Sequence, residues 1–79
     1  MNAYEKAIAE QLQLRYGYKP AEAKAVLEEY RAVIGLIGAY PMASDYAEYF
    51  HQAKQEGRTG KEWFNAIAKR REEAAAWAQ

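Results

Sequence analysis

The chain has 79 residues, eleven basic and eleven acidic side chains, and no cysteine. This length suffices for one domain with one small core, and the missing cysteine excludes disulfides, thiolate zinc sites and a cysteine nucleophile. The zero formal charge, spread evenly along the chain, also argues against strong sequence-independent attraction to phosphate backbones.

The sequence has no stretch typical of export or membrane insertion. Charged residues interrupt the first eleven positions, unlike a secretory signal, and the longest uncharged run, residues 32–44, is too short to span a bilayer. We therefore expect a cytoplasmic protein that does not bind membranes. A reducing compartment is compatible with the absence of cysteine.

The first predicted helix covers residues 3–16. Asn2 suits the N-cap position, and Glu5 completes a capping box with it. Ile8 and Leu12 then lie on one helical face, and Gly17 suits the end of the helix. The second predicted helix covers residues 20–37, where Pro20 suits the first turn and apolar residues recur at the i, i+3, i+4, i+7 positions.

The third predicted helix covers residues 44–56, with Ser44 as its cap. A turn at residues 56–60 follows, and Thr59 with Glu62 forms a second capping box that opens a helix over residues 60–76. The sequence thus predicts an all-α, compact four-helix domain over residues 1–79. Its expected core consists of Ile8, Leu12, Val26, Leu27, Tyr30, Ile34, Phe50, Trp63, Phe64 and Ile67.

Glu48 and His51 have the spacing with which di-iron carboxylate helices present two ligands. Such a site needs a second pair and two further glutamates, but the chain contains one histidine. Glu48 also lies almost opposite Phe50 on a helical wheel, away from the apolar face. We therefore expect no metal and no cofactor, and interpret His51 as part of a solvated helix face on which it hydrogen-bonds or pairs with Glu48.

Catalytic patterns are missing as well. Ser44 and Thr59 are the hydroxyl residues other than tyrosine, and both are interpreted as helix caps. No nucleophile–base pair has recognisable surroundings, and the glycines occur singly, without a phosphate-binding loop. We expect that the protein is not an enzyme.

Residues 46–71 read as a helix, a short glycine-containing turn and a second helix, which is the outline of a helix-turn-helix unit. Its DNA-facing residues would be Arg58, Lys61, Asn65, Lys69 and Arg70. Glutamates follow both Lys61 and Arg71, and the balanced charge disfavours a dominant phosphate contribution. DNA binding is therefore the alternative hypothesis.

The chain has seven tyrosines, two tryptophans and two phenylalanines, which are many for so small an interior. Several large side chains gather at residues 35–50, around the turn between the second and third predicted helices: Leu36, Tyr40, Met42, Tyr46 and Tyr49. The pattern leaves open whether this group is core or surface. If it is surface, it suits a protein contact. The leading hypothesis is a non-catalytic regulator, inhibitor or accessory subunit that binds a protein partner, or a second copy of itself, through these residues.

Overall fold

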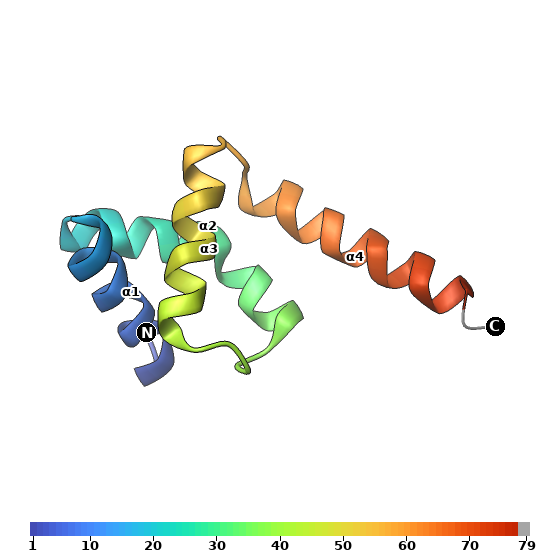
Figure 1. Cartoon of the computed structure of the whole chain (residues 1–79), viewed down its shortest axis with the longest axis horizontal. Coiled ribbons are helices and arrows are strands. Elements are labelled where there is room, and N and C mark those ends of the chain that lie inside the picture. The colour runs from blue at the N-terminus through green and yellow to red at the C-terminus, as the bar shows by residue number, and fades with distance from the viewer. Residues whose placement is uncertain (78–79) are drawn as a thin grey trace.

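The structure is a computed structural model that describes residues 1–77. It contains four helices, α1 (Ala3–Tyr16), α2 (Pro20–Ile37), α3 (Ala43–Gln55) and α4 (Gly60–Trp77), and no strand among the described residues (Figure 1). The predicted all-α, four-helix fold is confirmed, and the predicted helix ends differ from these by one residue at most. In the part of the chain that the structure describes, no helix combines the length and apolar character needed to cross a membrane.

The two predicted capping boxes are present. At α1, the Glu5 N–H donates to Asn2 Oδ1 over 2.8 Å, and the Asn2 N–H donates to Glu5 Oε1 over 3.2 Å. At α4, the Glu62 N–H donates to Thr59 Oγ1 over 3.1 Å, and the Thr59 N–H donates to Glu62 Oε1 over 3.2 Å. Each pair satisfies backbone donors that a helix N-terminus leaves free, so both helices start where the sequence predicts.

The predicted cap at Ser44 is wrong. Helix α3 begins at Ala43, and Met42 occupies the N-cap position without a side-chain hydrogen bond to the helix. The Asp45 carboxylate accepts a hydrogen bond from the Met42 N–H over 3.1 Å instead. An acidic side chain in the first turn also interacts favourably with the positive end of the helix dipole, which explains why this helix begins without a hydroxyl cap.

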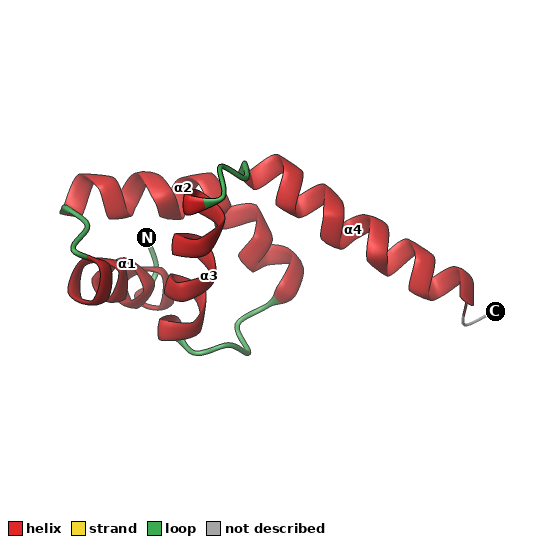
Figure 2. Cartoon of the chain, turned by 45° about the horizontal axis from the view of Figure 1, so that its top comes forward, coloured by secondary structure: helices red, strands yellow, loops and turns green. Residues whose placement is uncertain are grey.

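Helices α1 to α3 enclose the core (Figure 2). Helix α1 packs against α2 and α3, and α2 also packs against α3. The Phe50 ring lies 5.3 Å from that of Tyr30, and the Tyr46 ring meets the Tyr4 ring edge-on at 5.9 Å. The buried apolar residues are Ile8, Ala9, Leu12, Ala23, Val26, Leu27, Tyr30, Val33, Tyr46, Ala47, Phe50 and Ala53.

Helix α4 leaves this bundle. Its backbone lies against α2 and not against α1 or α3, and its C-terminal half extends away from the other helices (Figure 1). Six predicted core residues are confirmed as buried: Ile8, Leu12, Val26, Leu27, Tyr30 and Phe50. The other four are only half-buried, so their assignment to the buried core was wrong: Ile34, Trp63, Phe64 and Ile67. The last three lie on α4, whose backbone packs against α2 alone, although Trp63 also meets the Phe50 ring of α3 edge-on at 5.8 Å. Ile34 lies on α2 and packs against the core while staying partly exposed.

The start of α4 is fixed tightly to α2. Gly60 is buried, and its N–H donates to Glu29 Oε2 over 2.6 Å. The Tyr30 hydroxyl donates to the backbone carbonyl of Arg58 over 2.6 Å, and the Trp63 ring meets the Tyr30 ring edge-on at 5.5 Å. A carboxylate hydrogen-bonded to a helix N-terminus is a charge-assisted interaction, so this junction determines where α4 points.

Candidate functional site

The predicted contact residues around the α2–α3 turn divide into exposed and buried members. Tyr40 and Met42 are 94% and 70% exposed, Tyr49 is 43% exposed, and Leu36 is half-buried. Tyr46 is completely buried, so its assignment to the contact surface was wrong. The group that the sequence predicted is thus split, because Tyr46 faces α1 and lies against the Tyr4 ring, whereas Tyr40 and Met42 are exposed.

Two tyrosine hydroxyls hold the turn in place from the core side. Tyr46 donates a hydrogen bond to the Gly38 carbonyl, and Tyr4 donates one to the Pro41 carbonyl. Gly38 has a φ of 101°, a backbone conformation that residues with a side chain rarely adopt. Burial raises the pKa of Tyr46 to about 12, and the neighbouring Tyr4 and Tyr49 hydroxyls add to the shift. The turn that displays Tyr40 is therefore fixed by the core rather than free to move.

The exposed surface continues along α3. Tyr49 follows Met42 by seven residues, which is two helical turns, so both lie on the same face. Tyr49 also lines a hollow of about 150 Å³ together with Gln52, Arg58 and Trp63. We refer to Leu36, Tyr40, Met42 and Tyr49 as the turn surface.

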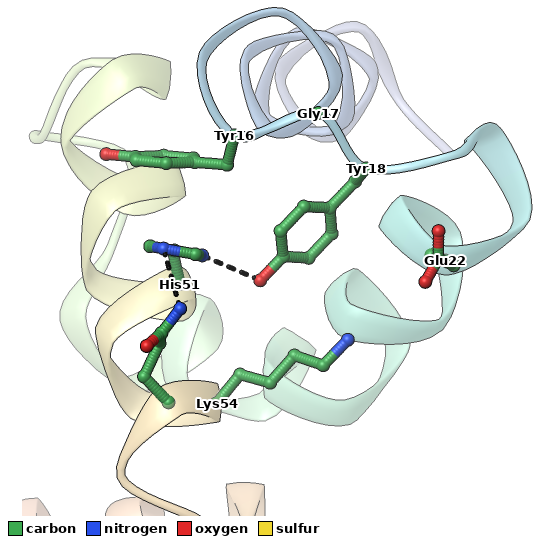
Figure 3. A pocket seen from close by; sticks show the side chains of 7 residues that line it. Tyr16, Gly17, Tyr18, Glu22, His51 and Lys54 are labelled. Atoms are coloured by element: carbon green, nitrogen blue, oxygen red, sulfur yellow. Dashed lines mark hydrogen bonds between the residues drawn. The ribbon is translucent and has the colours of Figure 1, made fainter.

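A separate pocket of about 450 Å³ lies at the other end of α1, where its C-terminus meets α2 and α3 (Figure 3). Gly17 ends α1 with a φ of 73°, so that the chain reverses between Tyr16 and Tyr18 and both rings face α3. The Tyr16 ring stacks on His51 with centroids 4.1 Å apart and planes 10° apart. We refer to this site as the His51 pocket.

Both nitrogens of the His51 ring are engaged within the pocket. Nδ1 and the Tyr18 hydroxyl share a hydrogen bond of 2.8 Å, and Nε2 lies 3.2 Å from the Gln55 side-chain nitrogen (Figure 3). With the proton on Nδ1, the ring donates to Tyr18 and accepts from the Gln55 amide. Burial raises the pKa of Tyr18, and the charge of Glu22 and the hydroxyl of Tyr16 raise it further. These contacts fix the imidazole in one orientation.

The expectation that His51 belongs to a solvated face beside Glu48 was wrong. His51 is half-buried between Tyr16 and Tyr18, whereas Glu48 is exposed. Within residues 1–77, no group of three or more histidine, aspartate and glutamate side chains is arranged to hold a metal ion. The sequence feature that could have predicted the pocket is Tyr-Gly-Tyr at residues 16–18, at the end of a helix. A glycine in the left-handed conformation redirects the chain there, between two large rings.

The residues of the DNA-binding alternative are all exposed: Arg58, Lys61, Asn65, Lys69 and Arg70. Lys61, Asn65 and Lys69 follow one another at four-residue intervals and so share one face of α4. Glutamates 62 and 72 lie beside that face, and Arg58 forms an ion pair with Glu56 over 3.2 Å. The backbones of α3 and α4 do not pack together as the two helices of a helix-turn-helix unit do.

No protein-family model matches this sequence, and no curated protein and no solved structure matches it.

Proposed function

We propose that this protein is a non-catalytic interaction domain that contacts another protein through the turn surface. The observation that carries the proposal is the exposure of Tyr40 and Met42, two positions apart in the sequence, at a turn whose Gly38 carbonyl accepts a hydrogen bond from the buried Tyr46. Exposed apolar side chains that together form a contiguous patch with a polar rim are typical of contact sites. Tyrosine in particular offers a large contact area with few rotatable bonds.

The supported turn lowers the cost of binding. The hydroxyls of Tyr4 and Tyr46 hold the carbonyls of Pro41 and Gly38, so a partner meets a backbone that is already ordered. A preorganised surface loses less conformational entropy on association than a mobile loop does. Tyr46 therefore supports the contact without touching the partner, and its removal is expected to damage the fold as well as binding.

A second copy of the chain is the partner to test first. The molecule has no net charge, so electrostatic repulsion between copies is small. Sedimentation equilibrium over a wide concentration range measures this directly. A wild-type protein that stays monomeric at high micromolar concentration excludes the homodimer and leaves a different protein as the partner.

The turn surface itself is tested with Tyr40→Ala and Met42→Ala, with Leu14→Ala as the matched control. Leu14 is 79% exposed on α1, so it offers a large apolar side chain outside the turn surface. We expect the two turn variants to keep wild-type stability within about 0.5 kcal/mol because their side chains are exposed. At least one of them is expected to weaken the dimer or the partner complex by about 1 kcal/mol or more.

For a partner other than the chain itself, a photo-crosslinking amino acid at position 40 is compared with the same group at position 14. The crosslinked protein is recovered from host cells and identified by mass spectrometry. A species captured at position 40 and not at position 14, and whose binding Tyr40→Ala weakens, supports the proposal. Equal capture at both positions, or unchanged binding of both turn variants, contradicts it.

A further inference from the structure

The His51 pocket has features of a binding site that the proposed protein contact does not use. None of the residues that line it belongs to the turn surface. Its volume of about 450 Å³ lies within the range of about 300–1,000 Å³ typical of small-molecule sites. Aromatic rings and a few convergent polar groups line it, as they do in such sites (Figure 3).

The imidazole of His51 acts as a fixed wall of this pocket. Its two nitrogens are hydrogen-bonded to Tyr18 and Gln55, and one ring face is covered by Tyr16. These contacts leave no free ring nitrogen to coordinate a metal or to act as a base. The groups still available to a ligand are therefore the Lys54 ammonium, the Tyr18 ring and the outer oxygen of Glu22.

Two opposite charges line the pocket, those of Lys54 and Glu22. Lys54 Nζ lies 4.8 Å from the centroid of the Tyr18 ring and forms no ion pair with any described residue. Glu22 directs one carboxylate oxygen to the N-terminus of α2, where it accepts the Lys19 N–H over 3.1 Å. The Glu22 carboxylate thus already has a hydrogen-bond donor in its own helix, whereas the contact recorded for the exposed Lys54 ammonium is the Tyr18 ring.

We propose that the His51 pocket binds a small planar aromatic carboxylate. The carboxylate pairs with Lys54, and the ring lies against the aromatic wall formed by Tyr18 and His51. A charge-assisted hydrogen bond supplies the orientation, and aromatic contact supplies the remaining affinity. For a ligand as small as benzoate, the expected dissociation constant is on the order of 1 mM.

The test is an NMR titration of the full chain with benzoate. His51 is the only histidine, so its ring protons give one assignable pair of signals inside the pocket. Benzylamine serves as the matched aromatic cation, and inorganic phosphate as the matched non-aromatic anion. We expect a saturable shift of the His51 signals with benzoate and none with either comparison compound.

Lys54→Met keeps the side-chain stem and removes the charge, and Lys61→Met makes the same change at an exposed position outside the pocket. Loss of a charge-assisted contact predicts about tenfold or more weaker benzoate binding for Lys54→Met, with Lys61→Met unchanged. We expect both variants to remain folded because both lysine side chains are exposed, and circular dichroism verifies this.

Several results would overturn the proposal. They are the absence of a saturable benzoate shift well above the expected dissociation constant, equal binding of benzylamine, equal binding of phosphate, and unchanged benzoate affinity in Lys54→Met. Binding of benzylamine would show that Glu22 pairs with an aromatic cation in the pocket. Binding of phosphate would show that the charge of Lys54 is sufficient and that no aromatic contact is needed. None of these results bears on the turn surface, so the two proposals fail or succeed separately.

Discussion

Replacing Gly60 by alanine is the sharpest test of how α4 is attached. A Cβ atom at this position would lie 1.9 Å from the backbone oxygen of Glu29 and 3.0 Å from its carbonyl carbon. Cβ contacts under 3.0 Å essentially do not occur, so the two helices must separate by at least 1.1 Å, the difference between 3.0 and 1.9 Å. Both contacting groups are backbone, and no side-chain rotation relieves the clash.

Separation of that size breaks the contacts of the junction. The hydrogen bond from the Gly60 N–H to the Glu29 carboxylate involves a charged acceptor, and its loss costs about 1.5–3 kcal/mol. Weakening the edge-on contact between Tyr30 and Trp63 adds about 0.5–1.5 kcal/mol. The usual gain of about 0.5–1 kcal/mol from glycine to alanine in a helix opposes these losses. We expect Gly60→Ala to lower the free energy of unfolding by about 2–3 kcal/mol.

Gly35→Ala is the matched control for this experiment. Gly35 lies within α2, is exposed, and a Cβ there meets no atom within 4 Å. It is therefore expected to stabilise the protein by about 0.5–1 kcal/mol. The two variants carry the same chemical change, so their opposite signs isolate the close approach of α4 to α2.

Urea denaturation measures both variants, followed by circular dichroism and by Trp63 fluorescence in a Trp77→Phe background. With a slope of about 1 kcal/mol per molar urea, the Gly60→Ala midpoint should fall by about 2–3 M. If the substitution Gly60→Ala already separates α4 from α2 in the native state, the Trp63 emission of this variant shifts to longer wavelength without denaturant. The slope of its unfolding free energy against urea concentration then decreases as well. A Gly60→Ala protein that is stabilised like Gly35→Ala would refute the tight junction.

Two further predictions follow from the buried tyrosine and from the charges of α4. The pKa of Tyr46 is about 12 in the fold against 10.0 for a tyrosine in water, so the fold favours the neutral phenol. The neutral Tyr46 phenol contributes up to about 3 kcal/mol to the free energy of unfolding. This contribution is complete below pH 10 and is lost as the pH rises from 10 to 12. Denaturant unfolding at several alkaline pH values should show less loss for Tyr46→Phe than for the wild type, and identical profiles would contradict the assignment. For DNA, the mixed charges beside Lys61, Asn65 and Lys69 lead us to expect no duplex binding at micromolar protein in low salt, measured by fluorescence anisotropy. Salt-sensitive binding that Arg58→Ala or Lys61→Ala weakens would restore the DNA-binding alternative.

The sequence alone determined where the helices begin and end to within one residue, although it predicted the wrong cap for α3. The capping boxes at Asn2–Glu5 and Thr59–Glu62 were readable because their hydrogen bonds join residues three positions apart. The same holds for Gly17, whose role depends on the backbone of its own helix end. Such interactions form within one helical turn, so residue type and spacing are sufficient to predict them.

Only the tertiary structure decided which apolar faces are covered. Tyr40 and Tyr46 belong to one aromatic group in the sequence, but Tyr46 is buried because α1, about forty residues earlier in the chain, brings Tyr4 against it. His51 became part of a pocket through Tyr18, a residue 33 positions away. Periodicity identifies the apolar face of a helix, whereas burial depends on whether another element reaches that face. For α4 the difference is largest: its stripe predicted a core helix, but the backbone of α4 lies against α2 alone. Trp63 still reaches the Phe50 ring of α3 at 5.8 Å, yet Trp63 and Ile67 stay half-buried.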